Sequence, residues 1–181
     1  MLSKRLTILA CSLITGIAVL LGAWAMTGTK YAKPLNLNDV KYHQLRGASK
    51  KQVECLATNI YREAGYEPRE GQLAVGMVTM NRLQSGNYAD SVCGVVHQKS
   101  GSTYQFSWVG MRNLPAMNPN VYQNILELAT MIYMNHTKMI DPTHGSTFYH
   151  ADYIPDPGWG RNLTKSTKIG RHIFYTKKHN L

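Results

Sequence analysis

Apolar residues recur at helical spacing in several parts of the chain, beginning with residues 49–64. Val53, Leu56, Ile60 and Ala64 lie three or four positions apart, so a helix places all of them on one face. A helix with one apolar face is stable when that face packs against the rest of a domain. This segment therefore predicts an amphipathic helix that packs against other elements.

Local signals mark both ends of this predicted helix. Ser49 followed by Gln52 matches a capping box, in which the two side chains and the first backbone N–H groups bond reciprocally. Gly65 and Pro68 then break the helix. Glu63 falls just off the apolar face near that end. We therefore expect its carboxylate at the lip of a cleft, held by a helix and open to a ligand.

Three further helices are predicted from apolar patterns and caps. Residues 70–83 are apolar along almost their whole length, which is typical of a buried central helix. Residues 91–96 are consistent with a short helix. Asn118 as the cap and Pro119 in the first turn begin a helix that runs to about Asn135.

The C-terminal part of the chain has a different pattern. Residues 146–150 and 171–175 are expected to be short strands, with a Pro- and Gly-rich loop between them. Residues 99–114 contain Gly, Ser and aromatic residues and are expected to form a loop. The fold class that these patterns predict is mainly α, of the α+β kind, with a small C-terminal β element.

An uncharged apolar run at residues 6–26 follows Lys4 and Arg5. A helix of about 20 residues crosses a bilayer, and the run is longer than the apolar core of about 7–15 residues of a signal peptide. Positive charge before the run favours a cytoplasmic N-terminus. We therefore expect a single-pass protein of the inner membrane, anchored through residues 6–26, with its main domain on the outer side.

This interpretation divides the chain into three parts. Residues 1–28 are expected to be a signal anchor or transmembrane helix, residues 29–48 a linker, and residues 49–181 the folded domain. Cleavage after Ala23 or Ala25 stays open as an alternative, because the Ala-Trp-Ala sequence has the small-x-small form of a cleavage site.

The formal charge of +10 favours an anionic partner. Nucleic acid, a membrane surface and bacterial cell wall polymers all belong to that class. The Lys and Arg residues are spread along the chain, and no nucleic-acid-binding motif accompanies them. We therefore expect no nucleic acid partner, and a solvated basic surface also explains the charge.

The chain contains three cysteines. Cys11 lies in the apolar run, whereas Cys55 and Cys93 lie in the main domain. On the outer side of a membrane these two form a possible disulfide, which would stabilise the domain by roughly 3–4 kcal/mol in the chain-entropy model. Two buried thiols are the alternative.

Glu63 is the best candidate for acid/base chemistry among ten acidic residues. Cleavage of a glycosidic bond needs a protonated carboxyl group, and burial against apolar groups raises a carboxyl pKa. Tyr61 and Tyr66 are expected to provide such surroundings. The alternative is a glutamate at a helix end that faces water. Glu67 and Glu70 lie at the start of the next helix, where the helix dipole favours negative charge.

Other chemistries have little support in the sequence. The seven histidines form no His-Glu-x-x-His or similar ligand pair, and no Gly-x-Ser-x-Gly motif is present. We therefore expect no metal and no cofactor. Trp108, Tyr149, Tyr153 and Trp159 are candidates for stacking on sugar rings, although aromatic residues also build cores.

Several motifs occur in the order seen in SleB/CwlJ-type cell wall hydrolases, a family with the pattern IYxEARGExxxGQxAVxxVxxNR. The matching segments are IYREAGYE at 60–67, EGQLAV at 70–75, NR at 81–82, QFSW at 105–108, YHA at 149–151, PGW at 157–159 and IGRHIFY at 169–175. The chain resembles this family over most of residues 51–177. It departs from the pattern at Gly65-Tyr66, where the family has Arg-Gly.

The resemblance implies a lysozyme-like, transglycosylase-type fold and an enzyme whose partner is peptidoglycan. It would cleave between N-acetylmuramic acid and N-acetylglucosamine, as a lytic transglycosylase or a muramidase, with Glu63 as the single catalytic glutamate. The expected substrate-binding residues are Gln105, Ser107, Trp108, Tyr149, His150 and Trp159.

Alternatives to this activity stay open. An amidase would cut the wall peptide instead, and a non-catalytic module would only bind peptidoglycan. A muramidase that inverts the sugar would need a second carboxylate, for which Asp152 and Asp156 are candidates. The biological setting is either a phage endolysin, which causes cell lysis, or a bacterial wall-remodelling enzyme.

Overall fold

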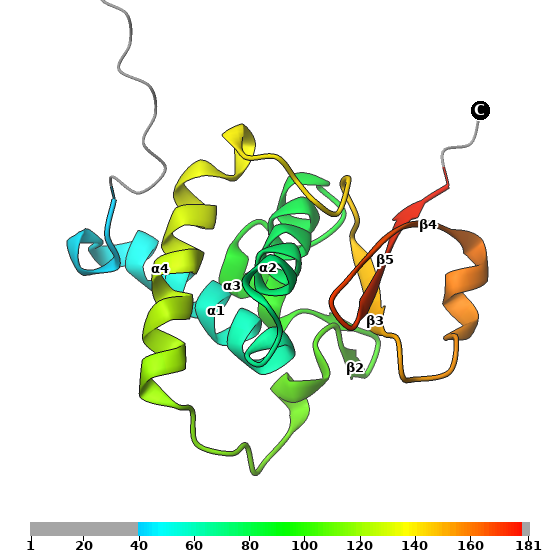
Figure 1. The fold of residues 1–181 in the computed structure, drawn as a ribbon, viewed down its shortest axis with the longest axis horizontal. Helices are drawn as coiled ribbons and strands as arrows, with labels where there is room; N and C mark the ends of the chain where they lie inside the picture. Colours follow the sequence, from blue (N-terminus) through cyan, green and yellow to red (C-terminus); the bar gives the residue numbers. More distant parts are fainter. Residues whose placement is uncertain (1–39, 179–181) are drawn as a thin grey trace, which may run out of the picture. The chain divides into compact units, whose positions relative to one another are not determined.

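The computed structural model describes residues 40–178, and the helices of this region lie beside a small antiparallel sheet (Figure 1). The α-helices are α1 (Gly47–Ala64), α2 (Arg69–Gln84), α3 (Val92–His97) and α4 (Pro119–Asn135). Short 3₁₀ helices are η1 (Tyr42–Gln44), η2 (Ser107–Gly110), η3 (His136–Lys138) and η4 (Gly158–Asn162). The strands are β1 (Lys99–Ser100), β2 (Thr103–Tyr104), β3 (Phe148–Ala151), β4 (Leu163–Ile169) and β5 (His172–Lys177). A helix-rich domain with a small sheet confirms the predicted fold class.

The four helices predicted within residues 40–178 are present, but the cap of α1 is not the expected one. Helix α1 begins at Gly47, and no side chain caps it. The Oε1 atom of Gln52 instead accepts a hydrogen bond of 2.9 Å from the backbone N–H of Cys93 in α3. The capping box at Ser49 was therefore wrong, because a tertiary contact uses the glutamine. At α4, the Oδ1 atom of Asn118 accepts bonds from two backbone N–H groups, which confirms that cap.

The folded domain begins before Ser49, which was its predicted first residue. Leu45 is buried in the core. The Tyr42 hydroxyl donates to Glu54 on α1, and the Tyr42 backbone N–H donates to Glu127 on α4. At least the last residues of the predicted linker 29–48 are thus part of the domain, because their apolar and polar groups pack on α1 and α4.

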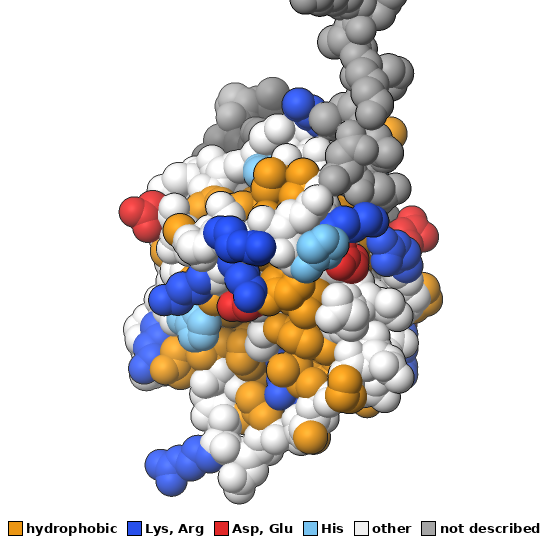
Figure 2. All heavy atoms as spheres, turned by 90° about the vertical axis from the view of Figure 1, so that its left-hand side faces the viewer, with side chains coloured by type: hydrophobic (Ala, Val, Ile, Leu, Met, Phe, Trp, Pro, Cys, Tyr) orange, Lys and Arg blue, Asp and Glu red, His pale blue; other side chains and the backbone are white. Residues whose placement is uncertain are grey.

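The predicted membrane segment, residues 6–26, lies outside the described residues. Within residues 40–178, no helix combines the length and the apolar character that crossing a bilayer requires. Lys and Arg side chains on the face formed by α4 lie in several separate places around apolar surface (Figure 2). This arrangement fits the dispersed positive charge expected from the sequence.

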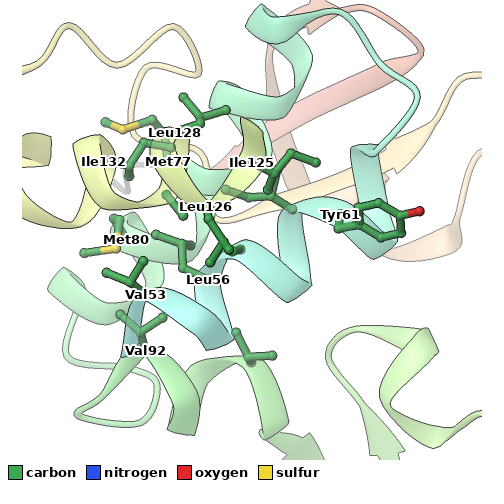
Figure 3. Packing of buried hydrophobic residues seen from close by; sticks show 14 of the residues in the cluster. Val53, Leu56, Tyr61, Met77, Met80, Val92, Ile125, Leu126, Leu128 and Ile132 are labelled. Carbon is green, nitrogen blue, oxygen red and sulfur yellow. The ribbon is translucent and has the colours of Figure 1, made fainter. Parts of the chain in front are cut away.

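The main hydrophobic core lies between the four α-helices (Figure 3). Its fully buried members include Leu56 and Ile60 from α1 and Ile132 from α4. Gly76 of α2 lies against two of them: a Cβ atom there would lie 2.6 Å from Ile132 Cδ1 and 3.0 Å from Ile60 Cδ1. The three helices therefore approach one another closely because this position lacks a side chain.

A second, smaller core joins α2 to the sheet. Ala74 and Val78 of α2 pack with Ile169 of β4 and Phe174 of β5. Helix α2 thus buries residues on two sides, which explains its nearly continuous apolar sequence and confirms the prediction of a central helix. The strand order is β3-β5-β4, and both pairings are antiparallel.

Three strands were absent from the prediction. Strand β4 is an edge strand with a mostly polar sequence, so it lacks an apolar alternation that would mark it. Strands β1 and β2 form a short hairpin inside the expected loop 99–114, where two-residue strands carry no periodic signal.

The structure joins Cys55 of α1 to Cys93 of α3 by a disulfide, the pairing that the sequence left open. The bond closes a loop with a sequence separation of 38 residues. It therefore connects the helix that carries Glu63 to the segment that leads into the β1–β2 hairpin.

We predict that Gly76→Ala destabilises the domain by about 1–3 kcal/mol, because the added methyl group overpacks the contact among three helices. Chemical denaturation followed by circular dichroism measures this change. Gly158→Ala is the matched control, because the nearest atom to its added Cβ lies 3.7 Å away at the end of the Arg161 side chain. Equal stability of the two variants would contradict the close packing at Gly76.

Candidate active site

A cleft with a volume of about 630 Å³ opens beside the C-terminal end of α1. Its walls come from α1, the segment around η2, and β3 with the loop that follows it. The predicted catalytic residue and the predicted substrate-binding residues all line this one cleft: Glu63, Gln105, Ser107, Trp108, Tyr149, His150 and Trp159. The volume lies in the usual range of small-molecule sites, about 300–1,000 Å³.

Glu63 lies in the last turn of α1 and points at β3. The hydroxyl of Tyr149 donates a hydrogen bond of 3.1 Å to Glu63 Oε2. Burial raises the pKa of Glu63 above its ordinary value of 4.5, while the Tyr149 bond and the positive charge of Arg82 act in the opposite direction. The carboxyl group therefore keeps its proton to a higher pH than an exposed glutamate, as a general acid requires.

The surroundings of Glu63 differ from those predicted. Tyr61 is buried, and its hydroxyl accepts a bond from the backbone N–H of Asn118. Tyr66 is 94% exposed. Neither tyrosine covers Glu63, because residues two apart on a helix do not face each other and Tyr66 lies beyond the helix end. Tyr149 is the tyrosine that contacts the carboxyl group.

Arg82 is a cleft residue that had no predicted role in the site. It is only 4% exposed, and its guanidinium lies over the rings of Phe106 and Tyr88, at 4.8 and 5.3 Å from their centres. Its Nε atom donates a 2.8 Å bond to the Thr147 carbonyl. The sequence feature that could have indicated a site role for Arg82 is its position, as an arginine near the end of an otherwise apolar, buried helix. Here it places a buried positive charge in the wall of the cleft.

Asn81, next to Arg82, fixes the loop that leads into β3. Its Nδ2 atom donates to Asp141, Thr143 and the carbonyl of Ser146. Asp141 in turn accepts bonds from the backbone N–H groups of Thr143 and Gly145. This network sets where β3 begins and so where Tyr149 lies.

The two neighbouring residues of β3 differ in role. The ring of Tyr149 lies edge-on to His172 and tilted against Phe174, with ring centres 5.2 and 5.6 Å apart, which orients its hydroxyl. The two ring nitrogens of His150 lie 2.9 Å from the Ala151 carbonyl and from the Tyr175 hydroxyl. Both nitrogens of His150 are therefore engaged within the domain, and its contribution to the cleft is the shape of the wall.

Aromatic side chains form the floor and the rim of the cleft. The indole N–H of Trp108 donates to buried Asn59 at 3.0 Å, so this ring is anchored to α1. Trp159 is 41% exposed and lies beside Phe148. Exposed apolar side chains that line the rim with it are Met111, Tyr153 and Ile154. Flat apolar surfaces beside polar groups are well suited to sugar rings, which have both apolar faces and hydroxyl edges.

Glu63 is the only acidic residue that lines this cleft among the described residues. Asp152 pairs instead with Lys168 at 2.7 Å and with Arg171 at 3.7 Å. Asp156 is exposed and does not line the cleft either. The candidates for a second carboxylate were therefore wrong, because the strand and loop turn them away from Glu63.

Across residues 40–178, no three His, Cys, Asp or Glu side chains gather closely enough to hold a metal ion.

Comparison with known families identifies the group to which this domain belongs. The sequence model of a family described as Cell Wall Hydrolase matches residues 66–175, which is more than half of the chain. The chain belongs to the cell wall hydrolase family. This match begins after Glu63, so the role of Glu63 depends on the geometry of the cleft.

Curated relatives of this cell wall hydrolase include two spore cortex-lytic enzymes. The one from Bacillus subtilis is 31% identical over 130 residues, which are 71% of this chain and 38% of that protein. The one from Halalkalibacterium halodurans is 29% identical over 128 residues, which are 71% of this chain and 36% of that protein. The chain thus spans well under half the length of these relatives.

Two solved structures share the fold of this hydrolase. The catalytic domain of the Bacillus cereus SleB protein is 25% identical, with a TM-score of 0.53, covering 73% of this chain and 94% of that domain. The catalytic domain of the germination-specific lytic transglycosylase SleB from Bacillus anthracis is 26% identical, with a TM-score of 0.55, covering 73% and 99%. The family that the sequence motifs indicated is confirmed.

We predict that Glu63→Gln raises the unfolding temperature of the hydrolase at pH 7. The folded state resists ionisation of Glu63, so stability falls as the pH rises from the unfolded pKa, about 4.5, through the raised folded pKa. Removing the ionisable group removes this loss. Calorimetry at pH 4 and pH 7 tests the prediction, with exposed Glu70→Gln as the control. A Glu63→Gln gain that is as large at pH 4 as at pH 7 would contradict the buried acid.

Proposed function

We propose that this chain cleaves the glycan strand of bacterial peptidoglycan between N-acetylmuramic acid and N-acetylglucosamine, with Glu63 as its single acid and base. The observation that carries the proposal is a buried carboxyl group, bonded to Tyr149, in a cleft with an aromatic rim. Membership of the cell wall hydrolase family supports the substrate. A related SleB domain is described as a lytic transglycosylase, which supports the reaction.

Protonated Glu63 begins the reaction as a general acid. It gives its proton to the glycosidic oxygen, and the bond between that oxygen and C1 of muramic acid breaks, leaving an oxocarbenium-like sugar. The hydroxyl of Tyr149 and the positive charge of Arg82 stabilise the carboxylate that remains. Aromatic rings at the rim hold the sugars in place during this step.

Ionised Glu63 then acts as a general base. It takes the proton from the 6-hydroxyl of the same muramic acid, and the freed oxygen bonds to C1. The product is a 1,6-anhydro sugar, and Glu63 has its proton back. One carboxylate is sufficient for this lytic route, whereas inverting hydrolysis uses a second one about 6.5–9.5 Å away. The single acidic residue in the cleft therefore favours the transglycosylase over the muramidase.

The setting that we propose is the outer side of the cytoplasmic membrane, with residues 6–26 as a signal anchor and single transmembrane helix. The uncharged run in the sequence supports this placement. The Cys55–Cys93 disulfide supports it independently, because disulfides persist in oxidising compartments. A phage endolysin that lyses the cell and a bacterial wall-remodelling enzyme both fit this setting.

Mass spectrometry of purified peptidoglycan after digestion by the full chain tests the proposal. We predict soluble fragments that end in 1,6-anhydromuramic acid, and a rate about 10²–10⁴-fold lower for Glu63→Gln, because the general acid is lost. Glu70→Gln is the matched control, since it makes the same change from carboxyl to amide at an exposed position outside the cleft. It should release the same fragments at the wild-type rate.

Other products would overturn the proposal in distinct ways. Reducing-end muramic acid would identify a muramidase. Free stem peptides with intact glycan would identify an amidase. Binding to peptidoglycan without any soluble product would identify a non-catalytic module.

A further inference from the structure

A second pocket, with a volume of about 290 Å³, adjoins the cleft at Glu63. The two hollows share four lining residues, Arg62, Glu63, Pro115 and Tyr153. The second one extends toward the loop between α1 and α2 and toward the turn between β4 and β5. It is therefore a side branch of the cleft that begins at the catalytic carboxyl group.

Two arginines line this side pocket, and both are held in place. Arg62 donates from Nη1 to the carbonyl of Pro115 at 2.8 Å, and its guanidinium lies 5.7 Å from the ring centre of Tyr61. The guanidinium of Arg171 lies 4.5 Å from the ring centre of Tyr153. A guanidinium that packing holds in position is well suited to bind a carboxylate through paired N–H groups.

Close contacts at two glycines fix the course of the backbone around the pocket. A Cβ atom on Gly65 would lie 2.5 Å from the carbonyl oxygen of Tyr61, so this position needs glycine in this conformation. Glu67 accepts a 3.0 Å bond from the backbone N–H of Arg171, and a Cβ on Gly170, where φ is 55°, would overlap that carboxylate. Glu67 thus holds the β4–β5 turn, and with it Arg171, against the loop that follows α1.

The wall of this pocket also contains the departure from the family pattern. Gly65 and Tyr66 line the pocket and occupy the positions where that pattern has Arg-Gly. Because a larger residue at Gly65 would require the backbone to move, this shape of the pocket is a property of the present chain.

We propose that the side pocket binds the acidic stem peptide of the muramic acid that is being cleaved, and that the enzyme prefers peptide-bearing glycan to bare glycan. This inference rests on the proposed function. Glu63 protonates the oxygen on C1 of muramic acid, and the peptide branches from the lactyl group on C3 of the same ring. The branch must therefore leave the cleft within one sugar ring of Glu63, which is where the pocket opens.

Charge complementarity identifies the peptide as the occupant of the pocket. Stem peptides carry free carboxylates, whereas an uncharged N-acetylglucosamine unit offers nothing to a pair of guanidinium groups. Glu67 is the one other acidic residue in the lining, and its carboxylate is bonded to the Arg171 backbone. Asp152, outside the lining, lies 3.7 Å from Arg171 Nε but pairs more closely with Lys168, at 2.7 Å. The main cleft, with its aromatic rim, then binds the glycan itself.

Isothermal titration calorimetry with the full-length Glu63→Gln chain tests the inference without turnover. The probes are a muramic acid-containing tetrasaccharide with tetrapeptide stems and the same tetrasaccharide after enzymatic removal of the stems. We expect the peptide-bearing probe to bind at least about tenfold tighter, which corresponds to about 1.4 kcal/mol. Adding Arg171→Gln should remove most of this preference while the affinity for the bare probe stays the same.

Lys165→Gln is the matched control, because Lys165 is an exposed cation on the edge strand β4 that does not line either hollow. It should leave both affinities unchanged. Equal binding of the two probes, or an equal loss for both with Arg171→Gln, would overturn the inference. An effect of Lys165→Gln as large as that of Arg171→Gln would also overturn it, since general charge would then explain the binding.

The result separates this inference from the proposed function. Cleavage of both glycans by the wild-type chain at equal rates, with equal binding, would leave the glycan-cleaving activity intact and refute the peptide pocket. Preferential binding of the peptide-bearing probe by a chain that cleaves neither would support the pocket and refute the activity.

Discussion

The hydrogen bond from Tyr149 to Glu63 connects the two parts of the domain on which the proposed chemistry depends. Glu63 is carried by α1 of the helical core, and Tyr149 is carried by β3 of the sheet. The same approach of sheet to helix that forms this bond also buries the carboxyl group and raises its pKa. The acid is therefore a product of tertiary packing, since neither element alone would withdraw Glu63 from water.

Helix α2 determines how closely the sheet approaches α1, because α2 packs against helices on one side and against the sheet on the other. Gly76 allows α1 and α4 to come close on one side, and Ala74 and Val78 pack against the sheet on the other. At its end, Asn81 fixes the loop before β3 and Arg82 enters the wall of the cleft. A single central helix thus sets the distance between the acid and the strand that faces it. This arrangement lowers the stability of the domain at neutral pH, because it buries an ionisable group. Such burial is common where catalysis needs a shifted pKa.

Local signals made most of the helical architecture predictable. The Asn118-Pro119 cap and the apolar repeat of α1 act within a few residues, so they persist in the fold. Features that depend on distant contacts were not predictable in this way. Gln52 bonds α3 instead of its own helix end, and β4 is held by its pairing with β5 despite a polar sequence.

The site shows the same division between local and distant effects. The site residues that the motifs predicted line one cleft, but the covering of Glu63 comes from Tyr149, which is 86 positions away, and not from the nearby Tyr61 and Tyr66. Arg82 had no predicted role, because a basic residue near the end of a helix is ordinary. Contacts with Phe106, Tyr88 and the Thr147 carbonyl, all from other segments, turn it into a buried charge near Glu63.

Direct titration of Glu63 tests the central claim, which is that packing keeps this carboxyl protonated beyond the ordinary range. The side-chain carboxyl carbons of glutamate can be labelled with ¹³C in the full-length chain, and the Glu63 signal assigned by its absence in Glu63→Gln. The pKa of Glu63 should then lie clearly above 4.5. A pKa at or below 4.5 would contradict the account, because Glu63 would then lack the proton that the first step transfers.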